Sequence, residues 1–151
     1  MFAKYYREYL KKNGIKANDV VVVSPDHGSN SRADALVSEL PGTSKVILTK
    51  YRPRPNLAEH LKVDSKQVKG KTCIIIDDII DTGGTIISAT DLLLDSGAKE
   101  VLVGASHAVL SKKTLSYVIN SRIKDIAITN TIEKKVAPRF NVLDIIDLIE
   151  L

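Results

Sequence analysis

The sequence is poor in cysteine and has no long apolar run. Its 151 residues include one cysteine, Cys73, which lies within an apolar segment. A single cysteine excludes a disulfide framework, so we expect Cys73 to be a core residue. No apolar run approaches the ~18 residues of a membrane-spanning helix, and the N-terminus lacks the apolar region of a secretory signal. These absences predict a cytoplasmic protein without a membrane span.

The chain also lacks internal repeats and low-complexity tracts. Its length is typical of one domain, which we place at residues 1–151. Hydrophobic residues make up 44% of the chain, which is enough for a core, and the 26% of charged residues suits solubility. The net charge of +4 is spread along the sequence. This balance is compatible with polyphosphate ligands and does not require a nucleic-acid partner.

Strand and helix patterns alternate along the chain. Strands are predicted at 20–24, 46–49, 72–76, 101–106, 126–129 and 142–145, helices at 2–12, 31–40, 86–96, 111–121 and 145–151, and a proline-rich loop at 52–55. This alternation predicts an α/β fold with a mostly parallel sheet and helices on both faces, a Rossmann-like three-layer arrangement. Ligands of such sheets bind beyond the carboxyl ends of the strands. Several polar residues are expected at those ends and support one shared active site: Ser24, Asp26, Lys50, Asp77, Asp78 and His107.

Residues 73–85, CIIIDDIIDTGGT, form the most informative segment. A β-branched run leads into Asp77 and Asp78, and Asp81 precedes the small turn of residues 82–85. Glycines let backbone N–H groups approach an anion, and the helix predicted next directs its positive end to the same place. Carboxylates repel phosphate, so they are better suited to sugar hydroxyls or to Mg²⁺. The segment indicates a site for a phosphorylated sugar; an acidic strand end before an ordinary turn is the alternative.

Four motifs in the same order resemble one family. The segment IIIDDIIDTGGT is similar to the phosphoribosyl-diphosphate (PRPP) signature of type I phosphoribosyltransferases and PRPP synthetases. VVVSPDHGSNSRADAL at 21–36 resembles a second synthetase motif, and TKYRPRPNLAEH at 49–60 resembles the synthetase catalytic loop. SGAKEVLVGASHAVLS and ITNTI complete the order. The chain is therefore similar to the C-terminal half of a ribose-phosphate pyrophosphokinase, which implies a type I phosphoribosyltransferase-like fold.

This resemblance implies roles for the candidate site residues. Ribose 5-phosphate would be bound by seven residues of the signature: Asp77, Asp78, Asp81, Thr82, Gly83, Gly84 and Thr85. Asp26 would help to hold Mg²⁺, which prefers oxygen ligands. Lys50 and Arg52 would be catalytic, because phosphoryl-type transfer needs positioning and cations where negative charge develops. Taken alone, Asp26 also fits an ordinary turn, and residues 50–56 also fit a solvated basic turn.

The chain departs from the family pattern at several positions. Ser29 and Asn30 stand where synthetases usually have a glycine and an apolar residue, and Asp34 stands where an arginine is common. Tyr51 stands at the place of a usual arginine, and Gly83 at the place of a frequent alanine. The departures in the first motif leave the fine shape of its loop open, but not its location. The change at Gly83 is expected to be mild.

The implied reaction is pyrophosphoryl transfer from ATP to ribose 5-phosphate, giving PRPP and AMP with Mg²⁺ as the cofactor. In the family, an N-terminal domain supplies much of the ATP site, and no adenine-binding segment is visible in this sequence. We therefore expect the chain to bind ribose 5-phosphate but to make little PRPP alone. We also expect it to form a homo-oligomer or to work with an N-terminal-domain partner.

Two other functions remain open. A phosphoribosyltransferase would use the same signature on PRPP, but it needs a hood segment over its base. No such insertion is apparent, and the 50–56 segment favours the synthetase. A non-catalytic, synthetase-like subunit is the other alternative. The presence of both Lys50 and Arg52 argues against that second alternative.

Overall fold

A parallel sheet of six strands forms the centre of the computed structural model, which describes residues 1–108, 111–129 and 140–143. The strand order is β2-β1-β5-β6-β7-β8, and every neighbouring pair is parallel. The strands are β1 (Val20–Ser24), β2 (Ser44–Ile47), β5 (Thr72–Ile80), β6 (Glu100–Ala108), β7 (Asp125–Thr129) and β8 (Phe140–Leu143). The carboxyl ends of these strands therefore lie along one edge of the sheet.

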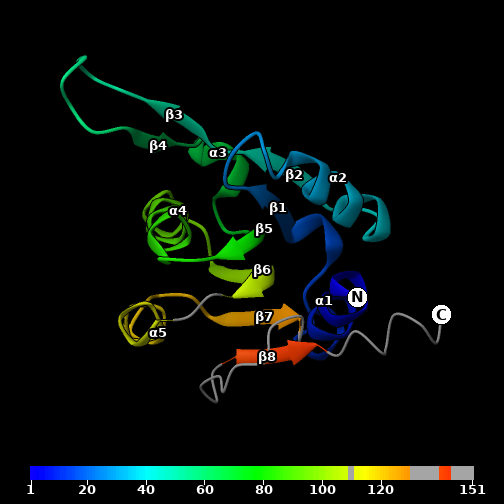
Figure 1. Cartoon of the computed structure of the whole chain (residues 1–151). Helices are drawn as coiled ribbons and strands as arrows, with labels where there is room; N and C mark the ends of the chain where they lie inside the picture. The colour runs from blue at the N-terminus through cyan, green and yellow to red at the C-terminus, as the bar shows by residue number, and fades with distance from the viewer. Residues whose placement is uncertain (109–110, 130–139, 144–151) are drawn as a thin grey trace.

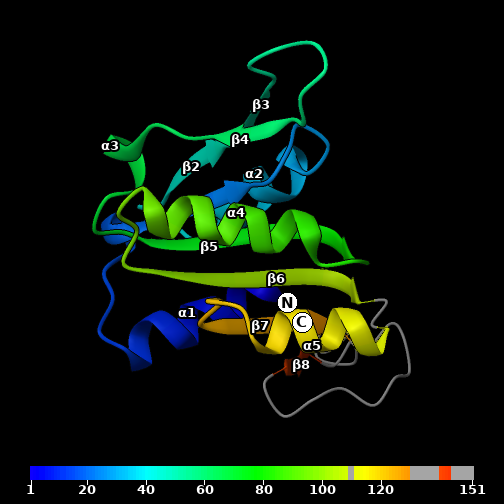
Figure 2. The ribbon, with the colours of Figure 1, turned by 90° about the vertical axis from the view of Figure 1, so that its left-hand side faces the viewer.

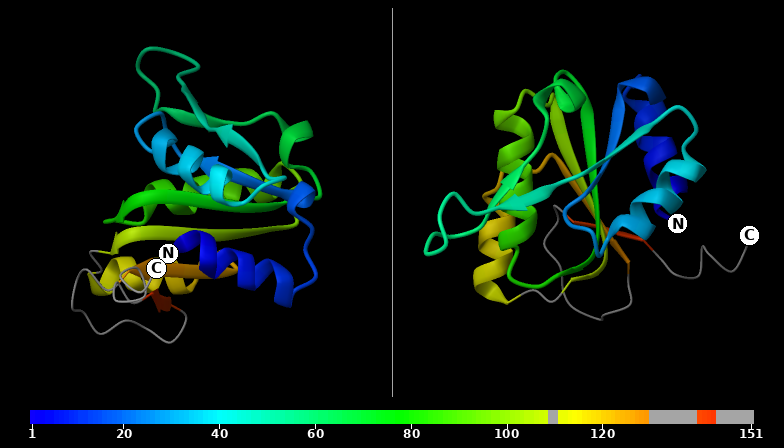
Figure 3. Two further views of the ribbon diagram at one scale, coloured as in Figure 1. Left: turned by 90° about the vertical axis from the view of Figure 1, so that its right-hand side faces the viewer. Right: turned by 90° about the horizontal axis from the view of Figure 1, so that it is seen from above.

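Helices cover both faces of this sheet, as the view from above in Figure 3 shows. On one face lie α1 (Phe2–Lys12) and α2 (Asn30–Glu39), and on the other α4 (Gly84–Asp95) and α5 (Lys112–Ile119) (Figures 1 and 2). The predicted α/β fold with a mostly parallel sheet and helices on both faces is confirmed. No helix among the described residues has the length and apolar character that a membrane crossing requires.

The sheet separates two apolar clusters because successive strand residues point to opposite faces. Val20 and Val22 pack with α1 and α2, whereas Val21 and Val23 pack toward α4 and α5. All four valines are fully buried. A strand that is buried on both faces needs an uninterrupted apolar run, which explains the sequence of β1. Cys73 is buried in β5, as predicted for a core residue.

The predicted bounds of α1 and β1 are confirmed to the residue, whereas the strand predicted at 46–49 is observed two residues earlier as β2 (Ser44–Ile47). Three strands were predicted too short, and β7 is the least affected, since it only begins one residue earlier. β5 continues beyond 76 to Ile80, and β6 continues beyond 106 to Ala108. Each strand supplies the other with a pairing partner over this extension, for example Asp77 with Ala105. Asp77 and Asp78 consequently lie within a strand. The strand predicted at 142–145 is observed as β8 (Phe140–Leu143), and the helix predicted at 145–151 lies outside the described residues.

A two-stranded antiparallel hairpin was missed by the sequence patterns. It consists of β3 (Thr49–Tyr51) and β4 (His60–Lys62), and it extends away from the rest of the molecule (Figures 1 and 3). Two short helices were also missed, the 3₁₀ helix Ala17–Asp19 and α3 (Ser65–Val68). The predicted loop at 52–55 is confirmed as part of the connection between β3 and β4.

Candidate functional site

The loop that follows β1 is held by its own aspartate. Asp26 Oδ1 accepts a hydrogen bond from the backbone N–H of Ser29 at 3.0 Å. A side-chain oxygen that closes a turn in this way is a common use of Asp after a strand. Ser29 is buried, and its hydroxyl donates to Asp77 Oδ1 on β5 at 2.8 Å. Ser29 thus connects Asp26, the residue predicted to bind metal, with Asp77, one of the residues predicted to bind the sugar.

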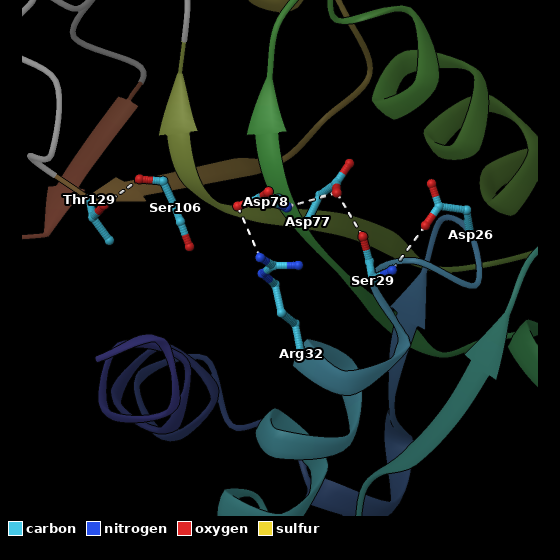
Figure 4. A network of polar contacts seen from close by, with 7 residues as sticks. All are labelled: Asp26, Ser29, Arg32, Asp77, Asp78, Ser106 and Thr129. Atoms are coloured by element: carbon cyan, nitrogen blue, oxygen red, sulfur yellow. Dashed lines mark hydrogen bonds and ion pairs between the residues drawn. The ribbon is translucent and has the colours of Figure 1, made fainter.

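Asp77 and Asp78 continue this polar network along β5 (Figure 4). Asp77 Oδ1 also accepts from the backbone N–H of Asp78 at 2.7 Å. Asp78 forms an ion pair of 3.1 Å with Arg32, which comes from α2. Both side chains are about half exposed, so this pair contributes little stability but orients two charges at the strand end. The network runs from Asp26 through Ser29 to Asp77, Asp78 and Arg32.

Two of the departures from the family pattern in the β1–α2 region, Asn30 and Asp34, share one partner. Lys45 on β2 donates to Asn30 Oδ1 at 2.7 Å and forms an ion pair with Asp34. An arginine at position 34, which the resemblance led us to expect, would face Lys45 with like charge. Asn30 and Asp34 are therefore both compatible with a lysine at position 45, because each of them contacts its ammonium group. The helix α2 lies where the sequence predicted it, shifted by one residue.

The signature turn leads directly into α4. Gly83 has a φ of +80°, which favours glycine, and α4 begins at Gly84. The first helical hydrogen bond in this turn joins Ile87 N–H to Gly83 O at 2.9 Å. The N–H groups before it point out of the helix end, where the helix dipole favours an anion. The N-cap residue Gly83 has no side chain to cap this helix end. The Thr82 hydroxyl accepts a long hydrogen bond of 3.4 Å from the Gly84 N–H, and Thr82, Gly84 and Thr85 are exposed.

A pocket of about 460 Å³ lies between the hairpin and the start of α4. Its lining residues come from two parts of the chain, Lys50, Glu59, His60 and Leu61 from the hairpin and Gly84, Thr85, Ser88 and Leu92 from α4. Leu61 packs against the core and is the cross-strand partner of Lys50. The core thereby anchors the strand pair that carries the Lys50 ammonium toward the signature turn.

The two predicted catalytic residues occupy different environments. Lys50 was predicted to belong to the catalytic loop, but it lies in strand β3. The chain is extended there because β3 pairs with β4. Arg52 lies beyond the strand and forms an ion pair of 3.3 Å with Glu59. Arg52 does not line the pocket with Lys50. Glu59 and His60 were not singled out from the sequence, because no local pattern signals an antiparallel pairing across a proline-rich connection.

The acidic residues fit Mg²⁺ only together with substrate oxygens. Among residues 1–108, 111–129 and 140–143, no group of three or more His, Cys, Asp or Glu side chains is arranged to hold a metal ion. Mg²⁺ retains water and is often bound by one or two carboxylates beside substrate phosphates. Asp26, linked through Ser29 to Asp77, supplies such a set. Its Oδ2 lies on the side away from the Ser29 N–H (Figure 4).

Cys73 does not take part in this chemistry. Burial raises the pKa of its thiol from 9.0 to about 12, so it is protonated at neutral pH. A protonated, fully buried thiol is neither a nucleophile nor a metal ligand. Near the signature turn, the pocket is lined by the ammonium of Lys50, the carboxylate of Glu59, the imidazole of His60 and the hydroxyls of Thr85 and Ser88.

Comparison with known proteins agrees with this arrangement. The family described as "Phosphoribosyl transferase domain" matches residues 2–138. The fold and the signature turn define a type I phosphoribosyltransferase domain, and the chain belongs to this family. Within it, the chain is a PRPP synthetase-like domain whose relatives are ribose-phosphate pyrophosphokinases, and it corresponds to their C-terminal part.

Individual relatives support this assignment. The chain is 47% identical to the ribose-phosphate pyrophosphokinase of Halalkalibacterium halodurans over 83% of this chain and 39% of that protein. It is 43% identical to the enzyme of the same name from Bacillus subtilis over 91% of this chain and 43% of that protein. The chain therefore spans about 40% of the length of these relatives.

Solved structures show the same fold. The phosphoribosylpyrophosphate synthetase of Mycobacterium smegmatis matches 98% of this chain and 46% of its own, with a TM-score of 0.79 and 36% identity. The adenine phosphoribosyltransferase of Saccharomyces cerevisiae matches 72% of this chain and 66% of its own, with a TM-score of 0.54. Its sequence is 21% identical, so this second likeness concerns the fold alone.

Proposed function

We propose that this chain provides the ribose 5-phosphate pocket and the catalytic loop of a ribose-phosphate diphosphokinase, which makes PRPP and AMP from ATP and ribose 5-phosphate in the cytoplasm. The observation that carries the proposal is the pocket that Lys50 of the hairpin lines together with Gly84 and Thr85 of the signature turn. A cation, hydroxyl groups and helix N–H groups at one place suit a phosphorylated sugar.

The proposed roles follow the positions of the side chains. The N–H groups and hydroxyls of residues 81–85 bind the 5-phosphate, because they are donors at the positive end of α4. Asp77 and Asp78 accept hydrogen bonds from the ribose hydroxyls. Asp26 holds Mg²⁺ together with substrate oxygens, and the bound ion supplies neutralisation of the polyphosphate charge.

Lys50 and Arg52 act on the charge that develops during transfer. Lys50 already lines the pocket, and Arg52 must leave Glu59 to reach a polyphosphate. Both are exposed on the hairpin, which leaves them room to approach a bound nucleotide. We assign no adenine-binding residue to this chain. We propose that a partner, a further copy of the chain or an N-terminal-domain protein, completes the adenine site.

Calorimetry with ribose 5-phosphate, ATP and PRPP, each with Mg²⁺, tests this function. Ribose 5-phosphate is expected to bind, ATP is expected to bind weakly or not at all, and AMP formation by the chain alone is expected to be slow. A folded protein that does not bind ribose 5-phosphate contradicts the proposal. Consumption of PRPP together with a purine or pyrimidine base supports a phosphoribosyltransferase instead.

A further inference from the structure

Ser29 lies where the β1–α2 loop meets β5, and both its N–H and its hydroxyl donate hydrogen bonds to aspartates there (Figure 4). Its N–H donates to Asp26 Oδ1 at 3.0 Å, and its hydroxyl donates to Asp77 Oδ1 at 2.8 Å. The residue is only 3% exposed. Water therefore has little access to replace the hydrogen bond to Asp77 if the Ser29 side chain is removed.

The hydroxyl of Ser29 does not cap the helix that it precedes. Ser29 is the N-cap residue of α2, where a serine normally accepts from an N–H of the first helical turn. Here the side chain makes no capping hydrogen bond. It donates instead to a carboxylate, and charge-assisted hydrogen bonds of this kind are stronger than neutral ones. The hydroxyl that would normally stabilise the start of α2 thus holds the Asp77 carboxylate instead.

The preceding glycine leaves room for this arrangement. A Cβ on Gly28 would lie 3.3 Å from Asp26 Oδ1, the same oxygen that accepts from the Ser29 N–H. A side chain at position 28 would therefore press on the turn that places Ser29. Three residues of the loop 26–29 therefore act together. Asp26 closes the turn, Gly28 leaves space for the Asp26 carboxylate, and Ser29 contacts β5.

We propose that Ser29 is a positioning residue that fixes the Asp77 carboxylate and ties it to Asp26 before any substrate arrives. The inference rests on the proposed function in so far as Asp77 orients ribose and Asp26 holds Mg²⁺. Groups that are already oriented need no reorganisation when the substrate binds. Ser29 itself touches no reacting atom; it acts through the two aspartates.

The first test uses the ligand-free protein and does not depend on the function. The ¹³C chemical shift of the Asp77 side-chain carboxyl is measured in the wild type, in Ser29→Ala and in Ser38→Ala. Ser38 is the matched control, because its hydroxyl bonds only to Ala35 O on the exposed side of the same helix. Ser29→Ala is expected to move the Asp77 signal and Ser38→Ala to leave it unchanged. Equal spectra for all three proteins would overturn the proposal.

The second test is a double-mutant cycle read by calorimetry with ribose 5-phosphate and Mg²⁺. Ser29→Ala is expected to weaken binding about tenfold, since a hydrogen bond to a charged group is lost. In an Asp77→Ala background the same substitution should change the affinity less than twofold, because the group that Ser29 positions is gone. An equal loss in both backgrounds would show that Ser29 acts by another route.

Folding and function are separated within these tests. Thermal unfolding is recorded for each variant, and Ser29→Gly provides a second hydroxyl-free protein if Ser29→Ala does not fold. If the wild type does not bind ribose 5-phosphate, the proposed function fails, and the carboxyl signal of Asp77 alone decides the positioning role. If ribose 5-phosphate binds and Ser29→Ala binds it as tightly as the wild type, the positioning role fails while the proposed function stands.

Discussion

Gly83 has a conformation that residues with a Cβ avoid. Its φ is +80°, and a Cβ added to it would lie 3.2 Å from Val118 Cγ2. The sequence comparison with the resembled family suggested that glycine instead of alanine here is a mild change. In this fold the difference is larger, because both the backbone angle and the contact with α5 disfavour a side chain.

Substitution of Gly83 tests this residue-level argument. Gly83→Ala is expected to lower the free energy of unfolding by about 1–2 kcal/mol, the usual penalty for a Cβ in the left-handed region. Gly84→Ala is the control, because that φ is not positive and its added Cβ meets only Thr82 Oγ1 at 3.5 Å. Urea unfolding measures both. Equal stability of the two variants would show that position 83 tolerates alanine.

The ion pair between Arg52 and Glu59 places a carboxylate beside a residue that should meet polyphosphate. Glu59→Gln is expected to raise the affinity for inorganic tripolyphosphate about two- to fivefold, in keeping with the modest strength of exposed pairs. Calorimetry at low salt measures the change. Glu8→Gln removes the same charge from exposed α1 and serves as the control. An equal gain in both variants would mean that only net charge matters.

At the scale of elements, the hairpin stands apart from the six-stranded sheet. β3 and β4 pair over three residues each and form a sheet of their own. Tyr51 and His60 face each other across the strands with ring centroids 5.7 Å apart. This contact is next to the Lys50–Leu61 pair, so it helps to keep Lys50 in an extended strand.

Removal of the aromatic contact should loosen the hairpin. Tyr51→Ala is expected to speed amide hydrogen exchange within residues 49–62 about two- to fivefold, because a cross-strand pair contributes a few tenths to about 1 kcal/mol. The rest of the sheet should exchange as before. NMR-detected exchange makes the measurement, with Tyr117→Ala, an exposed tyrosine of α5, as the control. Unchanged protection in the hairpin would rule out this role of Tyr51.

At the scale of the whole molecule, stability should fall in alkaline solution. Burial raises the pKa of Cys73 from 9.0 to about 12, and the pKa of Tyr6 is also raised by burial. Both groups are neutral in the folded protein and ionise more easily when it unfolds. The stabilising contribution of Cys73 is complete below pH 9 and decreases as the pH rises from 9 toward 12, and that of Tyr6 starts to decrease near its ordinary pKa of 10.

Cys73→Ala isolates the contribution of the thiol. The variant is expected to be less stable at pH 8 by about 1 kcal/mol, because burial of the sulfur is lost. Its stability should then fall less steeply with pH, since one titrating group can contribute up to about 1.4 kcal/mol per pH unit. Urea unfolding from pH 8 to 11 measures both curves. Parallel curves for wild type and variant would show that Cys73 does not titrate on unfolding.

The sequence alone determined the α/β class, the order of most elements and the location of the signature turn. β1 could be predicted to the residue because a strand buried on both faces requires an unbroken apolar run, and Val20–Val23 provide one. Local chemistry also located the helix that follows the signature turn, although α4 begins at Gly84, two residues before the predicted start at 86. Such features depend on neighbours along the chain.

The tertiary structure alone decided what depends on distant partners. β5 reaches Ile80 only because β6 pairs with it, and Lys50 lies in a strand only because β4 lies opposite. Asp26 is linked through Ser29 to Asp77, and Ser29 and Asp77 are 48 residues apart in the sequence. No local sequence pattern could therefore predict this link. Hydrogen-bond partners across a sheet are set by packing and register. Residue types and their spacing located the site, and the fold determined which of its groups touch.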